Sequence, residues 1–255
     1  MLFLLPPSET KRDGGVGASL ELGTLAFPSL TDARREALDA VTTLAGDQER
    51  SMSVLRLSPK QAGEVERNRT VLTSPTMAAV DRYTGVLYDA MSAETLDADA
   101  RAFAHRNVLV HSALFGLVRA LDAVPAYRLS HSSRLPGLML GKLWRQPVVD
   151  VLMALDGPIL DLRSEAYAAL GPAPAGSRTR YLRVVAEDGD GHKRALNHFN
   201  KKSKGQFTRA FAAGRPDVGT MDELCDWAHS AGFRLLPGAP GELHLVVSEV
   251  VASRS

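Results

Sequence analysis

Side chains that could do chemistry follow the first apolar run of the chain. Leu2–Leu5 ends at two prolines, and Ser8, Lys11 and Arg12 come soon after them. A serine three residues before a lysine can bind an anion, or can act as a nucleophile when the lysine is desolvated. The sequence does not show burial. Phosphate contact, nucleophilic catalysis and simple hydration of a loop therefore all stay open here.

A second group of polar residues follows a strand predicted at Ile159–Leu162. Glu165 and Tyr167 lie just beyond it, where α/β proteins commonly place functional residues, although a Ser-x-Glu sequence also caps helices. One hypothesis is therefore an enzyme that acts on a small anionic or nucleobase-like substrate. Its reacting residues would be Ser8, Lys11, Glu165, Tyr167 and Lys201.

The charge of the chain is segregated along its length. The 255 residues carry 30 Lys and Arg against 29 Asp and Glu, so the net charge of +1 indicates no partner. The range 191–216 nevertheless holds seven basic residues and no acid, and the range 123–149 holds four and no acid. If these segments meet in space, they form a basic cleft. The alternative is a hydrated helix face balanced by acids from elsewhere.

A basic cleft with aromatic neighbours is typical of nucleic-acid binding. Tyr127 and Trp144 each precede an arginine and could stack on unpaired bases, or could be ordinary core residues. Contacts to phosphates position a nucleic acid without reading its sequence, so we expect DNA to be selected by structure. The residues expected to bind nucleic acid or another anion are Lys11, Arg12, Arg119, Tyr127, Arg128, Arg134, Lys142, Trp144, Lys201, Lys202, Lys204 and Arg209.

The hydrophobic pattern predicts an α+β (mixed α/β) fold, with a mixed sheet and flanking helices in one compact domain over residues 1–255. Helices are predicted after Ser29 and Ser58 and at Asp97–Arg106, Gly141–Ala154, Ser203–Ala212 and Thr220–Ala231. Strands are predicted at Leu2–Leu5, Val108–His111, Ile159–Leu162, Arg180–Ala186, Ala195–Phe199 and Leu243–Val247. Asp188–Gly191 is predicted to be a hairpin turn, and Gly171–Gly176 a surface loop.

Several blocks of sequence resemble the YaaA family of bacterial proteins, which is linked to the peroxide stress response and described as DNA-binding. The blocks occur in the family's order at Leu4–Lys11, Tyr83–Gly85, Ser112–Leu129, Asp161–Tyr167 and Phe199–Gly205. The resemblance implies a DNA-binding basic cleft and a role in limiting oxidative damage. It also implies a helix-hairpin-helix-like element, for which the best candidate is Leu114–Arg119, with Gly116 close to a phosphate.

Other features exclude classes of protein or leave the question open. A single cysteine, Cys225, excludes an internal disulfide, and no pair of histidines has the spacing of a helical metal site. No metal and no cofactor is therefore predicted. No apolar run approaches the length of a membrane-spanning helix, and the N-terminus lacks a basic leader. We expect a cytoplasmic protein, and the sequence indicates no oligomeric state.

Overall fold

Strand β1 (Leu2–Leu5) lies inside a mixed eight-stranded sheet. The structure is a computed structural model, and it describes residues 1–176, 178–187, 193–195 and 199–248. All four side chains of β1 are buried, as the continuous apolar run predicts for a strand covered on both faces. The strand order is β4-β3-β1-β6-β7-β10-β9, and β8 pairs with β7.

The middle of the sheet is parallel and its margins are antiparallel. The parallel part of the sheet consists of β1 and four further strands. These are β3 (Val108–Ser112), β6 (Ile159–Asp161), β7 (Thr179–Glu187) and β10 (Glu242–Ser248). The antiparallel strands are β4 (Gly116–Arg119), β8 (Lys193–Ala195) and β9 (Arg234–Pro237). A separate small ribbon pairs β2 (Met77–Ala78) with β5 (Ala123–Val124). The predicted mixed α/β class is confirmed.

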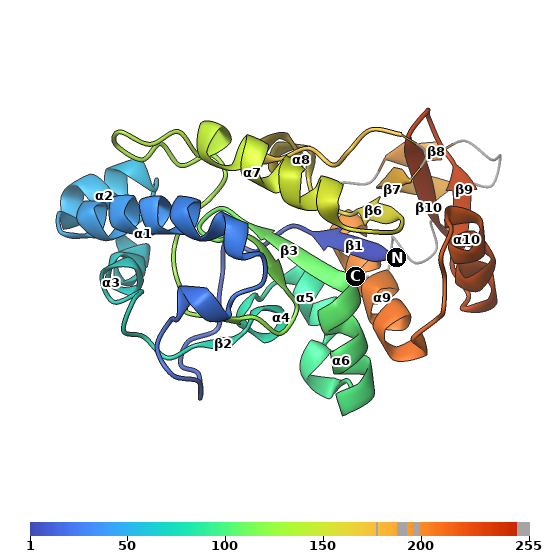
Figure 1. Cartoon of the computed structure of the whole chain (residues 1–255), viewed down its shortest axis with the longest axis horizontal. Coiled ribbons are helices and arrows are strands. Elements are labelled where there is room, and N and C mark those ends of the chain that lie inside the picture. Colours follow the sequence, from blue (N-terminus) through green and yellow to red (C-terminus); the bar gives the residue numbers. More distant parts are fainter. Residues whose placement is uncertain (177, 188–192, 196–198, 249–255) are drawn as a thin grey trace.

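Helices cover both faces of the sheet (Figure 1). α7 and α8 lie on one side, and α5, α6 and α9 lie on the other. The α-helices are α1 (Thr31–Ala45), α2 (Gln48–Val54), α3 (Gly63–Arg69), α4 (Ala79–Arg82), α5 (Val86–Met91), α6 (Ala98–Asn107), α7 (Leu140–Ala154), α8 (Glu165–Leu170), α9 (Phe199–Gly214) and α10 (Met221–Ser230). The 3₁₀-helices are η1 (Leu22–Thr24), η2 (Pro28–Leu30), η3 (Pro59–Gln61) and η4 (Ala93–Thr95).

Helix α9 is fixed against the centre of the sheet and against α5. The ring of Phe3 in β1 stacks on Phe211 with centroids 4.0 Å apart, and on Phe207 at 5.5 Å. A Cβ atom at Gly205 would collide with the carbonyl oxygen of Leu87, so only glycine lets α9 approach α5 this closely. The basic N-terminal turn of α9 and the start of α5 are thereby brought close to each other.

Most of the predicted helices and strands are present, with two corrections. Leu114–Arg119 does not form a helical element, because β4 occupies Gly116–Arg119 and forms a tight hairpin with β3. Of the strand predicted at Ala195–Phe199, Ala195 belongs to β8, residues 196–198 lie outside the described residues, and Phe199 begins α9. The predicted turn at 188–191 lies outside the described residues. Among those that are described, no helix is both long and apolar enough to cross a membrane.

The order of the strands places a crevice at the carboxyl end of β1. From β1 the chain passes to β3 on one side and later returns to β6 on the other side. Where consecutive strands diverge in this way, the loops that follow them separate and leave room for a ligand. The loops after β1 and β6 carry the two groups of polar residues that the sequence singled out.

Candidate functional site

A pocket of about 440 Å³ lies at this strand switch point. The loops that follow β1 and β6, the start of α5 and the first turn of α9 contribute to it. We call it the switch-point pocket; its lining residues are Pro6, Pro7, Ser8, Glu9, Thr10, Thr84, Gly85, Val86, Leu87, Tyr88, His131, Ser164, Tyr167 and Lys201. Its volume lies within the range of about 300–1,000 Å³ that is usual for small-molecule sites.

Lys11 lies beneath the loop that forms one wall of the pocket. Its ammonium donates to the carbonyl oxygens of Ser8 and Glu9 at 3.0 and 3.1 Å and lies 4.0 Å from the ring centroid of Tyr127. Burial, and next the nearby positive charge of Arg128, lower the pKa of Lys11 to about 7. Lys11 therefore ties the loop together from inside and is not exposed to solvent.

This position excludes the Ser–Lys nucleophilic pair that the sequence left open. Among the described residues, the Lys11 ammonium bonds to the backbone carbonyl of Ser8 and forms no bond with its hydroxyl. A base must lie within hydrogen-bond reach of the proton that it takes. In this geometry Lys11 positions the loop and does not activate Ser8.

Three hydroxyls form a chain along the same wall. Thr84 Oγ1 donates to Thr10 Oγ1 at 3.0 Å, and Thr10 Oγ1 lies 3.3 Å from Ser8 Oγ in a second hydrogen bond. The three hydroxyls carry three protons, and the two hydrogen bonds between them use two. Whether Thr10 or Ser8 donates in the second bond, one hydroxyl proton stays available to a ligand. Gly85, with φ of +97°, faces these hydroxyls and has no side chain to cover them.

The opposite wall follows β6. Ser164 caps α8, and its Oγ accepts a hydrogen bond from the backbone N–H of Tyr167 at 3.4 Å. The hydroxyl proton of Ser164 takes no part in that bond, so it too can be donated to a ligand. The rings of His131 and Tyr167 meet edge to face, with centroids 5.1 Å apart. This wall therefore combines a hydroxyl donor with aromatic surface.

A buried charged network holds the start of the loop after β6. The guanidinium of Arg163 pairs with Asp161 at 2.7 Å and donates to His111 Nδ1 at 2.8 Å and to the Gly171 carbonyl at 2.8 Å. Burial, and then the charge of Arg163, lower the pKa of His111 well below its usual value. These partners fix the backbone just before Ser164.

Two acidic residues of the region have basic partners. Glu9, which lines the switch-point pocket, accepts from Arg128 at 2.8 Å. Glu165 lies outside the pocket lining and pairs with Arg183 at 3.4 Å, while Arg183 pairs more closely with Glu242 at 2.6 Å. Glu9 is balanced by Arg128, which lies outside the lining, and Lys201 is the basic residue of the lining.

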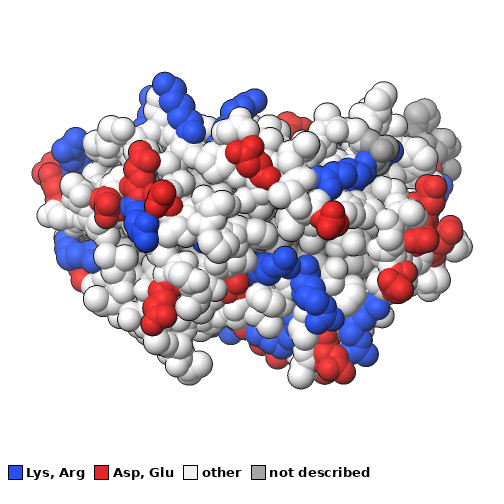
Figure 2. All heavy atoms as spheres, viewed as in Figure 1, with Lys and Arg blue, Asp and Glu red and all other residues white. Residues whose placement is uncertain are grey.

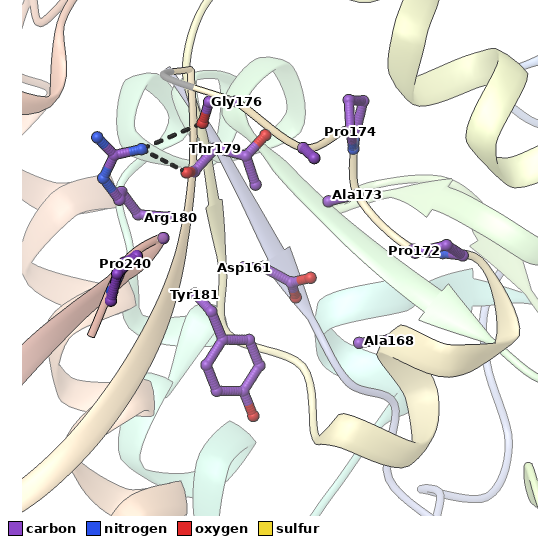
Figure 3. A pocket seen from close by; sticks show the side chains of 12 residues that line it. Asp161, Ala168, Pro172, Ala173, Pro174, Gly176, Thr179, Arg180, Tyr181 and Pro240 are labelled. Carbon is purple, nitrogen blue, oxygen red and sulfur yellow. Dashed lines mark hydrogen bonds between the residues drawn. The ribbon is translucent and has the colours of Figure 1, made fainter. Parts of the chain in front are cut away.

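A second pocket of about 560 Å³ lies between the loop after α8 and the start of β7 (Figure 3). Its walls include Pro172, Pro174 and Pro240, and Asp161 projects toward its centre. The Asp161 carboxylate is already held by Arg163, and Arg180 donates to backbone carbonyls of the rim. The polar groups of this pocket are thus largely committed within the protein.

The structure brings together most of the residues of the enzyme hypothesis. Ser8, Tyr167 and Lys201 line the switch-point pocket, and Lys11 lies directly beneath its loop. Glu165 does not line the pocket and pairs with Arg183, so the structure does not bring it together with the others. Sequence reasoning gave no role to Thr10, Thr84 or His131. The Tyr-Thr-Gly block was the one signal near Thr84.

The stacking role expected of Tyr127 and Trp144 is wrong, because neither ring reaches the surface. Both side chains are 0% exposed. The Tyr127 hydroxyl lies 2.7 Å from Ser112 Oγ and 2.9 Å from the hydroxyl of Tyr83. Trp144 Nε1 donates to the carbonyl of Ala113 at 2.8 Å. Both aromatic residues hold the β3–β4 hairpin and its surroundings together.

Several of the expected cations also belong to the interior. Lys204 is buried and donates to the Leu162 carbonyl at 2.9 Å; its burial lowers its pKa to about 8. Lys11 and Arg128 are buried as well. Arg119 donates to carbonyls in α6, and Arg209 donates to carbonyls at the end of α5. The expectation that Lys11, Arg128 and Lys204 face the solvent in a basic cleft is therefore wrong.

The remaining expected residues are accessible. Lys202 is partly exposed, and the exposed cations are Arg12, Arg134, Lys142 and Lys201. None of these four pairs with a carboxylate within the part of the chain that the structure describes. On the face drawn in Figure 2, basic and acidic side chains are interspersed.

A turn between two short helices lies beside the pocket. α4 and α5 are two short helices joined by Tyr83–Gly85, and the turn requires the positive φ of Gly85. The N–H of Gly85 donates to Asp89 Oδ1 at 3.1 Å. This turn lies on the rim of the switch-point pocket.

Fold and site together define a mixed α/β protein with a polar pocket at the carboxyl end of its central strand. Comparison of sequences is more specific. The family model of the peroxide stress protein YaaA matches residues 1–238, and the chain belongs to this family. A UPF0246 protein of Corynebacterium efficiens is 41% identical over 238 residues, which cover 91% of this chain and 94% of the relative.

Two further relatives extend the comparison. A UPF0246 protein of Streptomyces coelicolor is 42% identical over 249 residues, covering 95% of this chain and 94% of the relative. A UPF0246 protein of Dinoroseobacter shibae is 31% identical over 219 residues, covering 82% and 79%. The resemblance found in the sequence is confirmed, over nearly the whole chain.

Proposed function

We propose that the protein is a cytoplasmic DNA-binding protein that contributes to protection against peroxide. The observation that carries this proposal is Lys201, an exposed cation of the pocket lining that has no acidic partner among the described residues. Lys201 lines the pocket, Arg12 follows its first loop, and Arg134 belongs to the loop that carries His131. Arg12 and Arg134 are exposed cations of loops next to the pocket in sequence, and with Lys201 they would suit a phosphate backbone.

The family supports the second half of the proposal, since its description is that of a peroxide stress protein. Complementation of a host strain that lacks its own family member, followed by hydrogen peroxide challenge, tests this role. DNA binding is proposed to depend on the shape of the DNA more than on its sequence, because the cations involved would contact phosphates.

DNA binding is tested by charge reversal. In the double variant Arg12→Glu with Lys201→Glu, affinity for a short duplex should fall by about tenfold or more at 0.1 M salt. The log–log dependence of affinity on salt should become shallower, by about 0.7–0.9 for each phosphate that the variant no longer neutralises. Fluorescence anisotropy from about 0.05 to 0.5 M salt measures both quantities.

The matched control is Arg35→Glu. Arg35 is an exposed arginine of α1 that pairs with Asp32, away from the pocket lining. This variant should keep the salt dependence of the unaltered protein. Affinity that does not respond to salt at all, or an equal loss in the control, would count against phosphate contacts at the pocket rim.

The second candidate function is an enzyme that acts on a small anionic or nucleobase-like substrate. The volume of the switch-point pocket and the meeting of Ser8, Tyr167 and Lys201 in it favour this function. Against it, Lys11 does not reach the Ser8 hydroxyl, and Glu165 is turned away. If the protein is such an enzyme, Ser8→Ala removes turnover of a substrate and leaves duplex affinity unchanged.

A further inference from the structure

The switch-point pocket has more hydrogen-bond donors than its own acceptors use. The Ser8–Thr10–Thr84 chain leaves one hydroxyl proton free, and Ser164 leaves a second. Lys201 adds an ammonium that forms no ion pair with a described carboxylate. Such a set of donors, one of them an ammonium, fits an oxyanion that offers several acceptor oxygens at once.

The donors come from parts of the fold that are held rigidly. Lys11 fixes the carbonyls of Ser8 and Glu9 from below. The Tyr88 hydroxyl donates to the Pro6 carbonyl at 2.7 Å and ties α5 to the same loop. On the other wall, the Asp161–Arg163 pair holds the backbone before Ser164. Preformed donors of this kind bind an anion without the cost of ordering a loop.

The rest of the lining suits an organic group attached to the anion. Prolines, the start of α5 and the rings of His131 and Tyr167 give apolar and aromatic surface beside the donors. The free carboxylate oxygen of Glu9 can accept from a sugar hydroxyl or a base amine, since only its other oxygen is bonded to Arg128. A volume of about 440 Å³ accommodates one nucleotide and not a base-paired duplex.

We propose that the switch-point pocket binds a nucleoside phosphate monoester, presented either as the terminal nucleotide of a DNA strand or as a free mononucleotide. The strand-end form of this inference rests on the proposed function, because it names the part of the DNA that the pocket receives. The cations of the rim hold the duplex, and the hydroxyls of Ser8 and Ser164 hold the terminal phosphate.

The test compares four forms of one internally labelled hairpin DNA by fluorescence anisotropy. These forms carry a 5′-phosphate, a 3′-phosphate, or hydroxyls at both ends, or are closed into a dumbbell without ends. One of the phosphorylated forms should bind about tenfold or more tightly than the hydroxyl and closed forms, as expected for hydrogen bonds to a charged group. The monophosphate of the terminal nucleoside, added as a competitor, should lower the affinity for the phosphorylated form to that for the hydroxyl form. It should not change the affinity for the closed form.

Two variants report on the pocket, and a third serves as a control. Ser8→Ala and Ser164→Gly each remove a hydroxyl, and glycine is well tolerated at a capping position such as that of α8. Both should abolish the preference for a phosphorylated end while binding of the closed DNA stays the same. Ser53→Ala, at an exposed serine of α2 outside the pocket, should keep the preference.

The outcomes separate this inference from DNA binding itself. Equal affinity for all four DNAs, with normal salt dependence, excludes the strand-end form and leaves the proposed function standing, and calorimetry with the mononucleotide then decides on the pocket. If no DNA binds, the proposed function fails, and calorimetry with the mononucleotide decides on the pocket. Binding that is lost in Ser164→Gly then supports a free nucleotide as the ligand, and the absence of binding overturns the inference.

Discussion

At the scale of single residues, the switch-point pocket depends on a lysine that no ligand touches. Lys11 is 5% exposed and is surrounded by carbonyls and by the faces of Tyr83 and Tyr127, 5.5 and 4.0 Å from its ammonium. A buried ammonium is costly unless its donors are bonded, and here two backbone carbonyls satisfy two of the three. Its role is to hold the wall that carries Ser8 and Thr10.

This burial predicts how stability depends on pH. The folded-state pKa of Lys11 is lowered to about 7 and its unfolded value is 10.5, so between these values the unfolded chain binds more protons. The free energy of unfolding should therefore rise with pH from about 7 to 9, by up to about 1.4 kcal/mol per unit from this group. Urea unfolding across this range measures the slope.

The slope should be smaller by that amount in Lys11→Met, and unchanged in Lys142→Met, which alters an exposed lysine of α7. A slope that is the same in Lys11→Met as in the unaltered protein would mean that Lys11 is not the group that titrates.

Sequence reasoning succeeded with residues that directly follow strands. Ser8 and Tyr167 were chosen because they come after apolar runs, and parallel strands bring such positions to one edge. It failed with Tyr127, Trp144 and Lys204, whose neighbours in sequence are basic or polar while their neighbours in space are core. Burial of a ring or an ammonium depends on tertiary packing, which a local pattern does not contain.

At the scale of elements, the β3–β4 hairpin explains a glycine that had been assigned to phosphate contact. Gly116 has φ of +63°, and a Cβ there would lie 2.6 Å from Cζ3 of Trp144 in α7. The glycine thus serves the packing of α7 on the hairpin. A short apolar run such as Leu114–Val118 can form either a strand or part of a helix, and its periodicity does not decide between them.

This packing role predicts a large loss of stability in Gly116→Ala. Overpacking against Trp144 and the unfavourable φ together should lower the free energy of unfolding by about 2–4 kcal/mol. Gly137→Ala is the matched control: its φ is +76°, and a Cβ there meets nothing within 4 Å. Gly137→Ala should lower the free energy of unfolding by only about 1 kcal/mol, because it introduces the unfavourable φ without a steric clash. Equal losses in urea unfolding of the two variants would contradict a close contact with Trp144.

At the scale of the whole molecule, the first residues of the chain complete the sheet. β1 pairs with β3, more than a hundred residues later, and with β6, still further along the chain. Its Phe3 also stacks on α9 near the end of the described chain. The apolar run at Leu2–Leu5 predicted a buried strand, but its partners could not be predicted, since a strand's own sequence does not specify which strands it pairs with.

Because β1 joins these regions, the molecule should unfold in one cooperative step. Its two tryptophans report on different parts: Trp144 bonds to Ala113 beside β3, and Trp227 of α10 packs on Phe207 and Phe211 of α9. Trp227→Phe leaves the first as the only tryptophan, and Trp144→Phe leaves the second. In each variant the fluorescence and far-ultraviolet circular dichroism midpoints in urea should coincide. Two separately folding units would instead give a fluorescence midpoint displaced from the dichroism midpoint, in opposite directions in the two variants.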